Sequence, residues 1–376
     1  MHIIFSNDQM EPPSPSPSKP SASNFWLTAQ TNIQLKQRAL PIQPIARSAH
    51  FPLSFNQERL WLLEQLQPGR SVYNLLHTFH LQGTLNVAAL EQSLSELTHR
   101  HEILRTCFST VAGQPVQTIA PAIPLHLPVH DLQALSPAEQ ATTVQQIALQ
   151  DADHPFDLQC APLWRFQLLR LAPDDHVLIR TIHHLIFDGM SHSVFLRELG
   201  LLYSAFAASD PSPLSALPIQ YADFAYTQRQ WFQAGVFSHQ IDYWQQTLSH
   251  HPTAIILPID RPRPALPDYQ GSCHSFTITE DLTEALKAFS VQQGVSLFVT
   301  LLTAFQTLLY CYSQQEDMLI CSPVASRHYA GTRGLIGYFN NLVVTRTDLS
   351  GNPSFRDLLN RVSQVSLATS ANQDIP

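Results

Sequence analysis

The chain has 376 residues, 44% of them hydrophobic, which is enough for two domains with buried cores. Its 21 basic and 29 acidic side chains give a formal net charge of −8, which argues against binding nucleic acid through the phosphate backbone. The five cysteines are odd in number and form no CxxC pair, so we expect neither a disulfide framework nor a zinc site.

No secretory signal is recognisable at the N-terminus, because a basic region followed by an apolar stretch is missing. The most apolar window, Val295–Tyr312, is interrupted by serine, threonine and glutamine, and we interpret it as a buried helix. We therefore expect a soluble, cytoplasmic protein without a membrane anchor.

The N-terminal region has the composition of a disordered segment. Residues 11–23 read EPPSPSPSKPSAS, a Pro/Ser-rich run that cannot bury enough apolar surface to fold. We expect residues 1–40 to form a disordered leader and the folded chain to begin at residue 41.

The first half of the folded chain alternates strand and helix patterns. Asn86 is placed to cap the helix, and Ser191 or Ser193 to cap a helix that follows the last strand. The predicted elements are a strand at 77–81, a helix at 86–101, a β-leaning run at 103–108 and a strand at 176–184.

The second half continues this mixture, which indicates an α/β fold. Pro-rich stretches at 211–218 and 258–267 are where we expect the joint between two lobes. The predicted elements are a helix at 295–312, strands at 318–322 and 342–347, and a helix at 354–369.

The segment His183-His184-Leu-Ile-Phe-Asp188-Gly189 carries the densest chemical signal. Adjacent strand residues point to opposite faces, so only one histidine can face a given cleft. An imidazole with a pKa of about 6.5 can accept a proton from a nucleophile. Asp188 suits a buried carboxylate paired with an arginine. With 18 histidines in the chain, a chance pair before an ordinary Asp-Gly turn is equally compatible with these residues alone.

The pattern HHxxxDG resembles the signature of the chloramphenicol acetyltransferase-like superfamily, and specifically of nonribosomal peptide synthetase condensation domains. Six strings, one of which contains HHxxxDG, are similar to the core motifs of that family, in family order. They are Leu53–Leu63 (LSFNQERLWLL), Arg100–Phe108 (RHEILRTCF), Ile182–Ser191 (IHHLIFDGMS), Tyr221–Ala225 (YADFA), Ile336–Asn341 (IGYFNN) and Asn372–Pro376 (NQDIP).

The resemblance implies an α/β fold of two chloramphenicol-acetyltransferase-like lobes in a V arrangement, with the active site in a tunnel between them. We expect an N-terminal lobe at 41–225, carrying HHxxxDG, and a C-terminal lobe at 226–376. The sequence stops within the sixth motif, so we expect a truncated second lobe that lacks its closing elements and is poorly soluble or inactive alone.

The resemblance also implies the reaction: an aminoacyl thioester attacks an upstream acyl or peptidyl thioester and forms an amide. Phosphopantetheine arms of upstream and downstream carrier proteins would deliver both substrates, beside the adenylation domain of the same synthetase. The domain itself would bind no cofactor and no metal.

Roles for individual residues follow from the same resemblance. His184 would position the amine or accept its proton, and the backbone N–H of Gly189 would support the thioester oxygen. His183 would be packing, and Asp188 would form a structural ion pair with Arg327, whose loss costs about 3–5 kcal/mol when one partner is removed. Two further residues, Asn341 and Ser191, would line the substrate tunnel.

The first motif, SFNQERLWLLEQLQPG, is similar to that of domains that accept an L-configured donor, with a starter-type acyl donor as the alternative. Two alternatives remain: a freestanding acyltransferase of the same superfamily, and a non-catalytic remnant that only binds carrier proteins.

Overall fold

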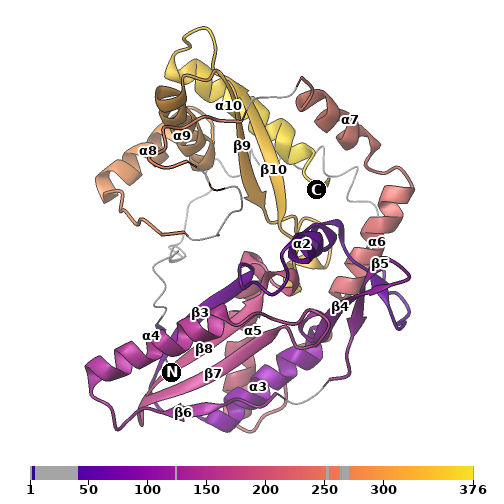
Figure 1. Ribbon diagram of the computed structural model, residues 1–376, viewed down its shortest axis with the longest axis vertical. Coiled ribbons are helices and arrows are strands. Elements are labelled where there is room, and N and C mark those ends of the chain that lie inside the picture. The colour runs from indigo at the N-terminus through magenta and orange to yellow at the C-terminus, as the bar shows by residue number, and fades with distance from the viewer. Residues whose placement is uncertain are drawn as a thin grey trace. The chain divides into compact units, whose positions relative to one another are not determined.

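The computed structural model of the chain describes residues 2–4, 41–122, 125–250, 254–262, 264 and 271–375 (Figure 1). The leader expected at 1–40 lies outside the described residues, apart from strand β1 (His2–Ile4). The folded chain divides into two compact units. The first contains Pro41–Ala234 and Arg327–Asn340, and the second contains Gly235–Ser326 and Asn341–Pro376.

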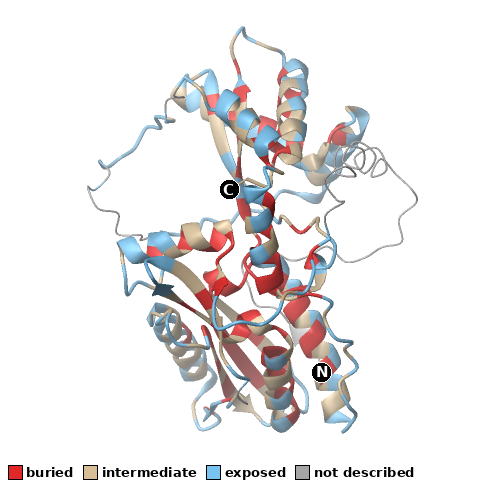
Figure 2. Cartoon of the chain, turned by 90° about the vertical axis from the view of Figure 1, so that its right-hand side faces the viewer, coloured by how far each residue is buried: buried red, intermediate tan, exposed pale blue. Residues whose placement is uncertain are grey.

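The first unit is built on a five-stranded sheet with the order β1-β3-β8-β7-β6. Only the pair of β6 and β7 is parallel, and the other neighbours run antiparallel. The central strand β8 is buried from His176 to His183 (Figure 2). The strands are β3 (Asn74–Gln82), β6 (Val129–Asp131), β7 (Trp164–Ala172) and β8 (Asp175–His183).

Helices α3 (Val87–Arg100) and α5 (Gly189–Ala207) pack against each other, and α4 (Pro137–Asp153) contacts β3 and β8 (Figure 1). Asn86 caps α3 as predicted, since its side chain accepts a hydrogen bond from the amide of Ala89. The cap predicted for α5 was wrong. The helix begins at Gly189 and Asp188 is its cap, because the carboxylate lies before the first turn while Ser191 already lies within it.

A smaller three-stranded sheet, ordered β2-β5-β4, completes the strands of this unit. The predicted β-leaning run at 103–108 begins instead with the 3₁₀ turn η1, and the strand starts at Thr106. The strands of this sheet are β2 (Phe51–Pro52), β4 (Thr106–Val111) and β5 (Gln114–Ile119). Helix α2 (Phe55–Leu66) follows β2, and η1 (Glu102–Arg105) precedes β4.

The division of the chain differs from the boundary expected at residue 225, which falls within helix α6 (Tyr221–Gln233). The chain passes between the units after Ala234, rather than in the Pro-rich stretch at 211–218. Residues 327–340, including the 3₁₀ turn η3 (Thr332–Gly334), belong to the first unit, because Arg327 is bonded to Asp188 there.

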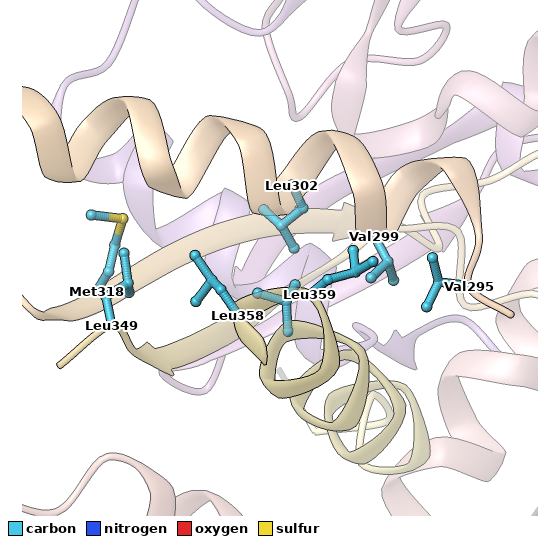
Figure 3. Packing of buried hydrophobic residues seen from close by; sticks show 8 residues of the cluster. Val295, Val299, Leu302, Met318, Leu349, Leu358 and Leu359 are labelled. Carbon is cyan, nitrogen blue, oxygen red and sulfur yellow. The ribbon is translucent and has the colours of Figure 1, made fainter. Parts of the chain in front are cut away.

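The second unit has its own hydrophobic core between α9, the strand pair β9–β10 and α10 (Figure 3). Val299, Leu302, Met318 and Leu359 are among the side chains that meet there. The four elements predicted from the sequence are present, with ends that differ from the prediction by one or two residues. The unit contains α7 (Ser238–Thr247), α8 (Glu280–Gln292), α9 (Leu297–Ser313), β9 (Asp317–Val324), β10 (Asn341–Asp348) and α10 (Phe355–Ala371).

Within the described residues, no single helix is long and apolar enough to cross a membrane. Helices α8 and α9 satisfy the length and composition criteria only as a pair, and they are bent by 105° at the break between them.

Candidate functional site

The two adjacent histidines lie where the central strand ends. His183 is the last residue of β8, and His184 begins the 3₁₀ turn η2 (His184–Ile186). The expectation that both residues lie on the strand was therefore wrong, because the chain leaves the sheet between them. Their side chains nevertheless have different environments, and each imidazole is held by its own partners.

His184 is fixed by a short hydrogen bond within its own loop. Its Nδ1 lies 2.6 Å from the carbonyl oxygen of Phe187, and its ring packs edge-on against Tyr338 with centroids 4.9 Å apart. Because a carbonyl oxygen only accepts, Nδ1 must carry the proton. The neutral ring then has its lone pair on Nε2.

The electrostatics of His184 favour that neutral form. Burial lowers its pKa, and the carbonyl of Phe187 and the nearby Asp188 only partly oppose this. Among the described residues, Nε2 has no hydrogen-bond partner. A half-buried imidazole with a free lone pair can accept a hydrogen bond or a proton from an amine.

His183 uses both ring nitrogens inside the protein. Nδ1 accepts a hydrogen bond from the amide of Leu185 at 3.1 Å, so Nε2 carries the proton and donates to Glu64 Oε1 at 3.2 Å. The side chain is 3% exposed. This arrangement supports the structural role predicted for His183.

Asp188 and Arg327 form the predicted ion pair, with Nη2 of Arg327 2.7 Å from Oδ1 of Asp188. Both side chains are buried. Asp188 Oδ2 accepts a further bond from the amide of Phe339 at 3.0 Å. The pair was expected to reach the C-terminal lobe, but Arg327 lies in the first unit, so it joins two segments of the same unit.

Ser191 is part of the same buried network. Its hydroxyl lies 2.7 Å from Asp188 Oδ1, 2.8 Å from Arg327 Nη2 and 2.9 Å from the carbonyl of Gly337. Arg327 also donates to the carbonyl of Thr332 at 2.9 Å. These bonds satisfy most of the polar atoms that folding removes from water, as buried charges require. The role of Ser191 in lining a substrate tunnel stays a prediction. Its hydroxyl is bonded within this buried network.

Gly189 is the first residue of α5, where a backbone N–H has no acceptor within the helix and lies at the positive end of the helix dipole. A Cβ atom built on Gly189 would meet nothing within 4 Å. The space beside its Cα is therefore open, and the role of its N–H as a donor to the thioester oxygen stays a prediction.

Asn341 is the first residue of β10, in the second unit. Its Nδ2 donates to the carbonyls of Gln373 at 2.9 Å and Ile375 at 2.7 Å, and the residue is buried. The side chain thus holds the segment after α10. Its predicted place in a substrate tunnel stays a prediction.

Two contributors to the site were not expected from the sequence. Glu64, in the first motif SFNQERLWLLEQLQPG, bonds to His183, and Gln57 Nε2 of the same motif donates to the carbonyl of Leu185 at 3.3 Å. Both come from α2, more than a hundred residues earlier in the chain. No local pattern could have found them. The described residues contain no group of three or more potential metal ligands.

Comparison with known proteins defines the class of protein to which this fold and site belong. Residues 47–376 match the family model of the condensation domain, and the chain belongs to that family. Condensation domains are amide-forming acyltransferases of nonribosomal peptide synthesis, which confirms the predicted family and enzyme class.

Curated relatives are parts of large synthetases. The chain is 45% identical over 339 residues to one of the linear gramicidin synthase proteins of Brevibacillus parabrevis, covering 90% of this chain and 4% of the relative. It is 43% identical over 336 residues to Chondramide synthase cmdD of Chondromyces crocatus, covering 89% of this chain and 9% of the relative. The chain thus spans a small fraction of the relatives' length.

Solved structures confirm the α/β fold. The X-domain from teicoplanin biosynthesis superposes with a TM-score of 0.81 at 28% identity, covering 90% of this chain and 74% of that one. The first condensation domain of the calcium-dependent antibiotic synthetase gives a TM-score of 0.74 at 22% identity, covering 86% and 76%. The second likeness supports the fold alone.

Proposed function

We propose that this chain joins an upstream acyl or peptidyl thioester to the amine of a downstream aminoacyl thioester, with His184 as the residue that handles the amine. The observation that carries the proposal is the hydrogen bond from Nδ1 of His184 to the carbonyl of Phe187. It directs the lone pair to Nε2, which has no partner among the described residues.

The amine is nucleophilic only when its own lone pair is free. Nε2 of His184 accepts a hydrogen bond, and then the proton, as the nitrogen attacks the thioester carbonyl. A carbon–nitrogen bond forms and the carbon–sulfur bond breaks. The proton that Nε2 accepted then passes to the leaving thiolate, which departs as a thiol. The N–H of Gly189 stabilises the developing oxyanion. Holding the two thioesters together supplies much of the rate gain, because the attack becomes effectively intramolecular.

The substrates reach the site on phosphopantetheine arms of carrier proteins, within a synthetase that also contains an adenylation domain, in the cytoplasm. Membership of the condensation-domain family and the relatives' place in large synthases support this assignment.

The donor is L-configured at the residue that is transferred. The first motif, LSFNQERLWLLEQLQPG at 53–69, supports this by its similarity to domains of that specificity. Matched donors with an L- or a D-residue at the thioester, offered with one acceptor, test it. We expect the L-donor to be used at least about tenfold faster. Equal rates, or a faster D-donor, contradict the assignment.

His184→Ala tests the proposed chemistry. With acyl and aminoacyl pantetheine thioesters as substrates, we expect amide formation to fall by about 10²–10⁴-fold while the melting temperature stays near that of the parent. Protonation of His184 should contribute to a decline of the parent rate only below pH 6.5, because burial holds the pKa of His184 under that ordinary value.

Two further variants serve as controls. His183→Ala should lower the melting temperature, because it removes a buried ring that bonds to Glu64 and Leu185. His99→Ala removes an exposed histidine and should change neither the rate of amide formation nor the melting temperature. Full turnover by His184→Ala refutes the assignment of His184.

A further inference from the structure

A cavity of about 490 Å³ lies in the first unit, at one edge of its five-stranded sheet. Residues of α3, η1, α4 and β7 line it, together with the loop that precedes β6. Its volume lies within the range of small-ligand pockets. No residue of the HHxxxDG segment lines this cavity, so the site proposed for amide formation does not account for it.

The cavity lies where β7 is not covered by its neighbour β6. Strand β6 pairs only with Leu168–Arg170, whereas β8 pairs with β7 from Trp164 onward. The amide of Leu168 donates to the carbonyl of Pro128 at 2.9 Å, and backbone groups two residues apart in a strand point to the same edge. The backbones of Trp164 and Phe166 are therefore directed to an edge with no strand neighbour among the described residues, and both residues line the cavity.

Apolar side chains form much of the wall. The rings of Trp164 and Phe166 pack edge-on with centroids 4.5 Å apart, and Leu125, Pro128 and Pro162 also line the cavity. A ligand with apolar groups would remove this surface from water, which is favourable.

Two buried side chains of the wall carry polar atoms without a hydrogen-bond partner in the described part of the chain. Trp164 is 2% exposed, and its Nε1 has no acceptor. The side chain of Asp151 is 8% exposed, and its Oδ2 has no donor. Oδ1 of Asp151, by contrast, accepts from Nε of Arg165 at 3.2 Å and from Nε2 of Gln167 at 3.0 Å. Buried polar atoms are nearly always paired, because an unpaired one costs free energy that a fitting ligand would recover.

The unpaired atoms define the chemistry of that ligand. Nε1 of Trp164 and the likewise unpaired Nε of Arg105 can only donate, and Oδ2 of Asp151 as a carboxylate can only accept. An ammonium group could not accept from the indole, and a carboxylate could not donate to Asp151. A secondary amide does both. The open edge of β7 favours an amide over a hydroxyl, because backbone N–H and C=O groups along a strand edge pair with those of an extended peptide.

We propose that this cavity binds a short peptide in an extended conformation along the open edge of β7. Its carbonyl oxygens accept from Trp164 and Arg105, its N–H groups donate to Asp151, and its apolar side chains lie against the walls. This inference goes beyond the proposed function, and it does not depend on His184 being the catalytic group.

Calorimetric titration of the full chain tests the proposal without any turnover. The probe is N-acetyl-leucine methylamide, and the reference is N-acetyl-N-methyl-leucine dimethylamide, which keeps the carbonyl oxygens but has no N–H. We expect the probe to bind saturably and at least about tenfold more tightly than the reference. Pantetheine is a second reference, because its amides are not spaced like those of an extended peptide, and it should also bind more weakly than the probe.

Asp151→Asn keeps the oxygen that accepts from Arg165 and Gln167 but replaces Oδ2 with an NH₂ group, which cannot accept. We expect it to weaken binding of the probe at least about tenfold. Trp164→Phe keeps a ring but removes the donor, and it should weaken binding in the same way even if Asp151→Asn fails to fold. Asp153→Asn removes an exposed carboxylate of the same helix outside the cavity and should bind like the parent.

No saturable binding of the probe overturns the proposal, since water alone would then satisfy the unpaired atoms. Equal or tighter binding of either reference overturns it as well, because the site would then not select the N–H groups of an extended peptide. Parent-like binding by a folded Asp151→Asn or Trp164→Phe variant overturns it too, since the probe would then bind elsewhere.

Discussion

At the scale of single residues, the buried site depends on close packing around Gly337. Its carbonyl accepts from Ser191, and its amide lies 3.0 Å from the same hydroxyl. A Cβ atom on Gly337 would lie 2.1 Å from Cδ2 of Tyr221. Tyr221 is itself fixed, because its hydroxyl donates to the carbonyl of Tyr338 and contacts Ser54 Oγ at 2.9 Å. The glycine is thus required by a neighbouring ring rather than by its backbone angles.

Gly337→Ala should therefore destabilise the chain by about 1–3 kcal/mol or more, because a fully buried ring must move. Chemical denaturation of the variant measures this loss. The matched control is Gly334→Ala, three residues earlier in the same segment, where a Cβ atom would meet nothing within 4 Å. Equal stability of the two variants would show that the ring of Tyr221 can move aside at little cost in free energy.

At the scale of elements, β3, β8 and α5 enclose a buried cation. Arg180 lies on β8 between the rings of Phe187 and Phe195, with its Cζ 4.5 and 4.6 Å from their centroids. Its Nη2 donates to Nδ1 of His192 at 3.0 Å, and the ring of His77 lies 4.7 Å from that of His192. Burial lowers the pKa of Arg180 to about 9. The guanidinium of Arg180 is thus contacted by two aromatic rings and by the imidazole of His192.

These histidines must be neutral in the folded protein, since His192 can accept from Arg180 only through a free lone pair. Burial, with Arg180 nearby, lowers the pKa of His77 to about 3 and that of His192 to about 4, from 6.5. Below pH 6.5 the unfolded chain binds more protons at these positions. Stability from both groups is therefore complete above pH 6.5 and lost as the pH falls toward 4.

We expect the melting temperature to fall between pH 7 and pH 4.5, and His192→Asn to reduce that slope because an amide can accept from Arg180 without titrating. His99→Asn, at an exposed position, should keep the parent slope. Thermal melts across this pH range provide the measurement. An unchanged slope in His192→Asn would show that groups other than His192 cause the loss of stability in acid.

At the scale of the whole molecule, each unit has a core of its own. In the first unit, Leu94, Leu97 and Ile182 are fully buried. In the second, the cluster between α9, the strand pair and α10 includes Leu359, which is 1% exposed (Figure 3). The chain contributes residues 327–340 to the first unit after building part of the second, so neither unit is a single continuous segment.

Leu359→Ala should cost about 2–5 kcal/mol, because it leaves a cavity in a core formed by few elements. Hydrogen exchange should show faster opening in α9, β10 and α10 than in α3 and β8. Leu367→Ala, on the same helix but 37% exposed, should change stability by less than about 1 kcal/mol. Uniformly faster exchange throughout the chain would indicate that the two cores unfold as one.

The sequence by itself determined the family, the α/β class, most elements and the local cap of α3, because motifs, apolar periodicity and caps are properties of neighbouring residues. It also paired Asp188 with Arg327, through resemblance alone. It could not place the end of β8 between the two histidines, nor the boundary between the units, since both depend on contacts from distant segments.

Only the tertiary structure decided which nitrogen of His184 is free, that Glu64 holds His183, and that residues 327–340 return to the first unit. It also made Asp188, rather than a serine, the cap of α5. Each of these outcomes requires buried polar atoms to find partners, often far away along the chain. Burial creates that requirement, and a linear sequence does not show which partners will meet it.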